Sequence, residues 1–105
     1  MSAQLQGAQV TLTAAPQNLT TLIRAQDPTF IDQAISSWAM RADSANTGQV
    51  RLLKAPLDNA TNRCGFLAAG DALAVDIRSM GLHTDGIWLL SSVPGDTVWV
   101  FGIVI

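Results

Sequence analysis

The chain has few of the side chains on which catalytic and metal sites depend. Its 105 residues include one cysteine, one histidine and no glutamate. A single histidine cannot supply the several imidazole ligands of a cupin-type metal centre, and a single cysteine cannot close a disulfide within the chain. These shortages exclude an internal disulfide framework and weigh against metal-dependent and nucleophilic chemistry.

Charge is scarce as well. Charged residues make up 13% of the chain, where about 25% is usual. Six basic residues stand against eight acids, all of them Asp, so no basic stripe exists for nucleic acid. No apolar run approaches the ~20 residues of a membrane span. A solitary soluble domain would need a more charged surface, so we expect part of this surface to be covered.

The first residues predict a location and an arm. The polar N-terminal sequence lacks the basic and apolar regions of a secretion signal, and we therefore expect synthesis and assembly in a cytoplasm. Residues 1–7 are predicted to form a flexible arm that orders only against a neighbour. Leu5 is its one large aliphatic residue besides the starting Met, which is too little to fold onto the domain.

From residue 8 to 105 the pattern predicts an all-β fold, a single antiparallel β-sandwich or jelly-roll-like domain of seven to eight strands. Short apolar segments recur between turn residues every 8–12 positions, which is typical of that class. Strands are expected over 9–13, 18–24, 35–42, 49–54, 66–77, 87–90 and 96–105. Asp27 and Pro28 predict the start of at most one short helix. The turn residues 43–48 predict a hairpin between the strands on either side.

The final strand, 96–105, is apolar on both faces. Strand alternation divides it into two sets, Val98, Val100 and Val104 against Trp99, Phe101, Ile103 and Ile105. One face belongs in the core, while the other normally meets water. Four large apolar groups left wet would each forgo roughly 1.5–3 kcal/mol of burial. We therefore expect a neighbouring subunit to cover the second set, with Leu5 of the arm, and predict an interface of Leu5, Trp99, Phe101, Ile103 and Ile105.

Two strand entries share a Gly-Asp pair, at Gly70–Asp71 and at Gly95–Asp96. Glycine accepts positive φ, and an aspartate can bond nearby backbone amides. A shared turn type explains the likeness better than an internal repeat. We predict positive φ at both glycines.

No constellation of residues predicts an active site. His83 is interpreted as a polar loop histidine, and Cys64 has only Arg63 as a cationic neighbour. The aspartates stand singly at turns, without a carboxylate pair or a calcium-binding loop. We therefore expect no catalytic residue, no cofactor and no metal.

The sequence leaves two roles open for the three tryptophans. Trp38, Trp88 and Trp99 could stack a sugar ring, since aromatic side chains serve that purpose. Each falls within an apolar strand, however, which favours core or interface packing.

Several glycine-turn motifs recur in one order between Trp38 and Ile105. The turn 45–48 leads into the strand 49–53, and the motifs 65–73, 87–90 and 95–100 follow. In this order the chain resembles small β-sandwich structural proteins of tailed-phage virions, particularly capsid decoration or cement proteins. The resemblance implies a non-enzymatic virion protein, assembled in the host cytoplasm and often trimeric. Its implied partners are copies of itself and the major capsid protein or other virion proteins, with the capsid lattice stabilised through subunit interfaces.

Other functions remain open on the sequence. A phage neck, tail or spike-base protein would share these motifs. A carbohydrate-binding module is the alternative from a different class, and a small cupin-like enzyme is third, weakened by its single histidine, His83. The mass in solution separates a monomeric binding module from a self-associating virion protein.

Overall fold

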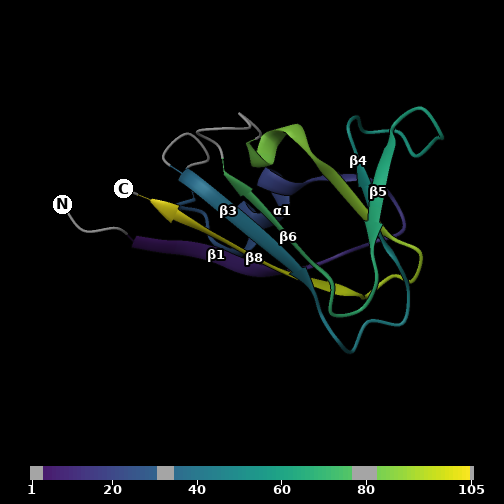
Figure 1. Cartoon of the computed structure of the whole chain (residues 1–105), viewed down its shortest axis with the longest axis horizontal. Coiled ribbons are helices and arrows are strands. Elements are labelled where there is room, and N and C mark those ends of the chain that lie inside the picture. Colours follow the sequence, from purple (N-terminus) through teal and green to yellow (C-terminus); the bar gives the residue numbers. More distant parts are fainter. Residues whose placement is uncertain (1–3, 31–34, 77–82, 105) are drawn as a thin grey trace.

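In the part of the chain that the structure describes, two four-stranded antiparallel sheets and one short α-helix form the fold, as the all-β prediction required. The computed structural model describes residues 4–30, 35–76 and 83–104 (Figure 1). Sheet A has the order β1 (Gln4–Thr11), β8 (Thr97–Val104), β3 (Ile35–Ala42) and β6 (Ala72–Asp76). Sheet B has the order β2 (Gln17–Asn18), β7 (Trp88–Ser91), β4 (Val50–Leu53) and β5 (Arg63–Leu67). This arrangement is compatible with a β-sandwich.

The core contains one face of each strand. In β8, Val98 and Val100 are 0% and 3% exposed, which confirms the predicted inward set for these two valines. Alternation in β3 buries every second side chain in the same way. The shared core cluster includes Trp38, Met40 and Ala42 from β3 and Val50 and Leu89 from sheet B.

The helix lies where we expected a strand, so that expectation was wrong. Helix α1 spans Leu19–Gln26 and is capped by Asn18, whose side chain accepts a hydrogen bond from the Thr20 amide at 3.1 Å. Leu19, Leu22 and Ile23 are buried at helical spacing. In this short segment the cap residue decides the conformation.

The predicted helix start is in fact a helix end. Asp27 is the C-terminal cap of α1, and its backbone amide donates to the Ile23 carbonyl at 2.8 Å. Residues 31–34, which follow the expected start, lie outside the described residues. A helix of eight residues on the chain agrees with the prediction of at most one short helix within the described ranges.

The predicted hairpin across residues 43–48 is also wrong. Strand β3 pairs with β6 and β8, whereas β4 pairs with β5 and β7. The turn therefore passes the chain from sheet A to sheet B. The expected strand 66–77 is divided into β5 and β6, and Gly70 at φ +84° lies in the connection. Gly95 precedes β8 at φ +97°, so positive φ is confirmed at both glycines.

The N-terminal arm prediction is wrong for residues 4–7. These residues belong to β1, which pairs with β8 of the same chain from Gln4 opposite Val104 to Thr11 opposite Thr97. Backbone hydrogen bonds order a strand whatever its side chains, which explains why a polar segment is held. Gly7 fits this pairing closely, because a Cβ there would collide with the backbone of Val100. Residues 1–3 lie outside the described residues.

Candidate functional site

The outward side of β8 presents three large apolar side chains to solvent. Trp99, Phe101 and Ile103 are 50%, 46% and 40% exposed, and we call these three residues the β8 face. The predicted division of the final strand is therefore confirmed where side chains are described. Leu5 is paired with Ile103 in the strand register, and Ile105 lies outside the described residues. Their shared role as an interface stays a prediction.

The β8 face is accessible because residues beside it on the adjacent strands are small. Strand β8 is a central strand, between β1 and β3 (Figure 1). Its outward side chains therefore stand in the middle of the sheet. Phe101 lies between Gly7 and Ala39 in the register, and Ala39 lies beside Ala74. Residues directly opposite one another share a face of the sheet. Phe101 is thus flanked by residues too small to cover it.

Little charge surrounds the β8 face. Trp99 lies between Gln9 and Arg41 in the register. Arg41 is the one charged residue on this side of sheet A among those whose side chains are described. Asp43 borders the face as well, since it lines a pocket together with Arg41 and Trp99. Among the described side chains, the β8 face therefore has one cation and one carboxylate at its margin, which is little to recognise a strongly charged partner.

A buried carboxylate fixes the start of β8. Asp96 is 7% exposed and accepts hydrogen bonds from the Ser91 hydroxyl at 2.8 Å, the Gly48 amide at 2.9 Å and the Thr47 amide at 3.2 Å. Burial raises the pKa of this carboxyl, but the three hydrogen bonds outweigh burial and hold the pKa below its ordinary value. Asp96 therefore remains ionised as a structural anchor.

This anchor joins two of the motifs on which the resemblance rests. Asn46 donates to the Thr97 carbonyl at 2.8 Å and accepts from the Thr97 amide at 2.9 Å. Gly48 is needed for close approach, since a Cβ there would lie 2.6 Å from the Ser92 hydroxyl oxygen and 2.9 Å from Asp96 Oδ2. The turn before β4 and the turn before β8 are therefore one bonded unit, built to hold the two sheets together.

The outer side of sheet B has a charged clamp that the sequence analysis missed. Asp58, in the loop between β4 and β5, accepts from Arg51 Nη1 at 3.0 Å and from Arg63 Nε at 2.8 Å. The hydrogen bond from Arg63 is the largest cause that lowers the pKa of Asp58, and Asp58 in turn raises the pKa of Arg63. Spacings of seven and five residues carry no period, so only the loop's path brings the three together.

Two leucines of the central strands of sheet B are buried outside the main core cluster. Leu90 lies directly opposite Arg51 in the register and therefore shares its face. Leu90 and Leu53 are 2% and 1% exposed, yet neither belongs to the main core cluster.

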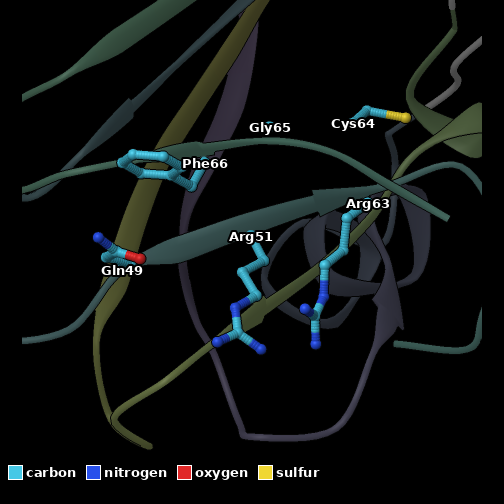
Figure 2. Close-up of a pocket in the computed structure, with 6 residues that line it drawn as sticks. All are labelled: Gln49, Arg51, Arg63, Cys64, Gly65 and Phe66. Atoms are coloured by element: carbon cyan, nitrogen blue, oxygen red, sulfur yellow. The ribbon is translucent and has the colours of Figure 1, made fainter. Parts of the chain in front are cut away.

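Beside the clamp lies a pocket of about 320 Å³. It is lined by Gln49, Arg51, Arg63, Cys64, Gly65 and Phe66 (Figure 2). Figure 2 shows both guanidinium groups extending to the same side of the hairpin, with the Cys64 thiol turned away from them. The pocket therefore offers cationic donors and one aromatic ring.

The residues that the sequence analysis considered for catalysis or binding lie in different parts of the fold. His83 precedes a single 3₁₀ turn, Thr84–Gly86, and the exposed Cys64 has its Sγ 3.6 Å from the Asn62 carbonyl. Within residues 4–30, 35–76 and 83–104, no group of three or more His, Cys or Asp side chains is placed to hold a metal. Trp38 is 2% exposed in the core, which leaves Trp99 as the most accessible of the three indoles.

Comparisons with known proteins identify no relative of the chain. Protein-family models, curated proteins and solved structures all give no match to the chain. Among the described residues, no helix is long and apolar enough to cross a membrane. The argument for function therefore rests on the surfaces described above.

Proposed function

We propose that this protein is a non-enzymatic structural component of a phage virion, of the capsid decoration or cement class, and that it works as a homo-oligomer. The observation that carries the proposal is the β8 face, three large apolar side chains 40–50% exposed at the centre of a sheet. The virion assignment comes from the resemblance of the turn motifs between Trp38 and Ile105.

A second copy of the same chain suits this face. Large exposed apolar patches mark interaction sites, because water contact there forgoes the burial energy. The partner must itself be apolar and nearly uncharged at the contact, and another copy supplies such a surface by symmetry. In the trimer that the resemblance implies, three β8 faces meet around the three-fold axis. The remaining surfaces are then free to bind the major capsid protein.

Sedimentation equilibrium of the purified chain tests the self-association. We expect a mass of three 11.1 kDa chains, and of one chain for Phe101→Asp, because burying an unpaired charge costs several kcal/mol. Val93→Asp is the matched control, since Val93 is 38% exposed in the turn before β8. Phe101→Asp that stays oligomeric places the interface elsewhere, and Phe101→Asp that unfolds makes this face part of the folded core.

Immunogold labelling of virions from the source phage tests the place in the particle. Label spread over the capsid shell supports a decoration protein. Label confined to the neck, tail or spike base supports the alternative within the same class, and unlabelled virions contradict the proposal.

A carbohydrate-binding module is a second candidate, favoured by one observation. Trp99 lines a pocket of about 320 Å³ together with Arg41, Ala42, Asp43 and Ser44. An exposed indole beside polar side chains is suited to stack on a sugar. A monomer whose tryptophan fluorescence titrates with added sugars, and no longer does so in Trp99→Ala, would establish this candidate in place of the virion protein.

A further inference from the structure

The edge of sheet B formed by β5 is open. Strand β5 is the last in the order β2-β7-β4-β5 and pairs with β4 on one side. The residues from Arg63 to Phe66 are exposed, and Phe66 is 58% exposed. An edge strand presents unpaired backbone donors and acceptors, which makes it a template for another strand. Strand β5 has neither proline nor lysine, and the devices that limit strand addition here are the charge of Arg63 and the irregular pairing with β4 at Leu52 and Leu53.

The same edge is the most basic part of the molecule. Residues 49–68 contain three of the six Lys and Arg residues and one of the eight Asp residues. This segment therefore has a net charge of +2 in a chain whose net charge is −2. A partner drawn to it by charge is acidic.

The two arginines of the clamp keep free donors. Asp58 takes one nitrogen from each, Nη1 of Arg51 and Nε of Arg63. A guanidinium has five N–H groups, and its fork matches a carboxylate. Within the described ranges, the other guanidinium nitrogens of both residues have no acceptor. Asp58 therefore orients the pair while leaving donors for a ligand.

We propose that the β5 edge and the pocket beside it bind an extended acidic peptide segment of a partner protein. The segment adds to β5 as a new strand, and one of its carboxylate side chains accepts hydrogen bonds from Arg51 and Arg63. An apolar side chain on the same face of the segment contacts Phe66, which lies opposite Arg51 in the register. Strand addition supplies backbone hydrogen bonds, and the pocket supplies the preference for a carboxylate. This site lies on sheet B and does not depend on the β8 face.

Fluorescence anisotropy with a synthetic probe tests the proposal. The probe is a labelled, capped peptide of alternating Val and Thr with one central Glu. A second peptide has Gln in place of Glu, and a third has Glu but alternate backbone amides methylated. We expect the Gln peptide to bind about tenfold more weakly, because it loses the charge-assisted hydrogen bonds. The methylated peptide is expected not to bind measurably, since it cannot complete the strand ladder.

Variants of the chain locate the site. Arg63→Gln should remove the preference for Glu over Gln, whereas Arg63→Lys, which keeps the charge without the fork, should retain part of it. Amide chemical shifts of the wild-type chain should change along 49–53 and 63–67 when the Glu peptide is added. Phe101→Asp should bind the peptide as the wild type does, so failure of the oligomer proposal leaves this test intact.

Each outcome decides one part of the proposal. Equal binding of the Glu and Gln peptides overturns the carboxylate preference, and equal binding of the methylated peptide overturns strand addition. Shift changes on sheet A, or an undiminished Glu preference in a folded Arg63→Gln variant, place the binding elsewhere and overturn the site.

Discussion

The outer sides of the two sheets differ in how far their central apolar side chains are buried. On sheet B, Leu53 and Leu90 are buried, and the loop between β4 and β5 is held there by Asp58. On sheet A, Trp99 and Phe101 stand about half exposed at the centre of the sheet. The chain thus buries the outward leucines of the two central strands of sheet B, although Phe66 at the edge of that sheet stays 58% exposed. In the described ranges it leaves the β8 face of sheet A uncovered.

This difference argues that the β8 face is meant for a partner. Leu90 is 2% exposed without any partner chain, which shows that an intramolecular cover is within reach of a chain of this length. Exposed apolar residues scattered singly need no explanation, but three in one row of a central strand do. The central outward leucines of sheet B are buried within the chain, whereas we propose that a second copy covers the β8 face of sheet A.

An aspartate introduced on the outer side of each sheet should give the largest difference in stability between the two sides. Leu90→Asp should destabilise the fold by more than about 4 kcal/mol, because it removes a buried leucine and buries an unpaired carboxylate. Phe101→Asp should cost the monomer only about 1–2 kcal/mol, because a side chain that is 46% exposed loses part of its burial and aspartate is disfavoured in a strand. Urea unfolding of both variants measures this. Equal losses would show that the two faces do not differ.

Removing the Asp96 anchor between the sheets should give the next largest loss of stability. Asp96→Ala leaves the Ser91 hydroxyl and the Thr47 and Gly48 amides without their acceptor, at a cost of about 3 kcal/mol. Asp85→Ala, at an exposed position of the 3₁₀ turn, is the control and should be nearly neutral. The free energy of unfolding from urea titration measures both, and a loss below about 1 kcal/mol for Asp96→Ala would refute the anchor.

Glycine substitutions compare the entries to sheet A with a strand of sheet B. Gly70→Ala and Gly95→Ala should each cost about 1–2 kcal/mol, because both residues have positive φ and the space around them is open. Gly65→Ala in β5 should be nearly neutral, since a Cβ there meets its nearest atom at 3.9 Å. Thermal melting of the three variants decides it. An equal loss at Gly65, which does not have positive φ, would show that positive φ does not set the cost at Gly70 and Gly95.

Removing the clamp on sheet B should have the smallest effect on stability, and this effect should depend on pH. The pKa of Asp58 is lowered from 3.8 in the folded state, so its contribution is present above pH 3.8 and is lost as the pH falls through the lowered value. Asp58→Asn should therefore melt slightly earlier at neutral pH and lose less stability on acidification than the wild type. Melting curves at about pH 7 and about pH 3 measure this. An unchanged acid dependence would show that the clamp contributes nothing.

The sequence was sufficient for features that depend on short-range pattern. Alternation in 96–105 predicted that Val98 and Val100 face the core and that Trp99 and Phe101 face outward, because a strand's side chains have a period of two. Positive φ at Gly70 and Gly95 followed from turn chemistry that is local to each glycine. The all-β class followed from the spacing of such turns.

The sequence failed where pairing partners or single caps decide. Residues 43–48 look like a hairpin loop, but Asp96, far along the chain, holds this turn so that it crosses between the sheets. Asn18 turns a segment with strand-like residues into helix α1, which no period in so short a stretch reveals. The arm was mistaken for free chain because backbone pairing with β8 leaves no trace in its side chains. The group of Arg51, Asp58 and Arg63 exists only once the loop has folded back.

Hydroxyl-radical footprinting, read by mass spectrometry, tests the central claim most directly. Oxidation of each side chain is measured at protein concentrations below and above those at which sedimentation detects assembly. We predict that Trp99 and Phe101 lose much of their oxidation in the assembled state, while Phe66 and Leu57, which are 58% and 62% exposed on the sheet B hairpin, keep theirs. Unchanged oxidation of Trp99 and Phe101 in the assembled protein would contradict the account, because the β8 face would then be bare in the assembly as well.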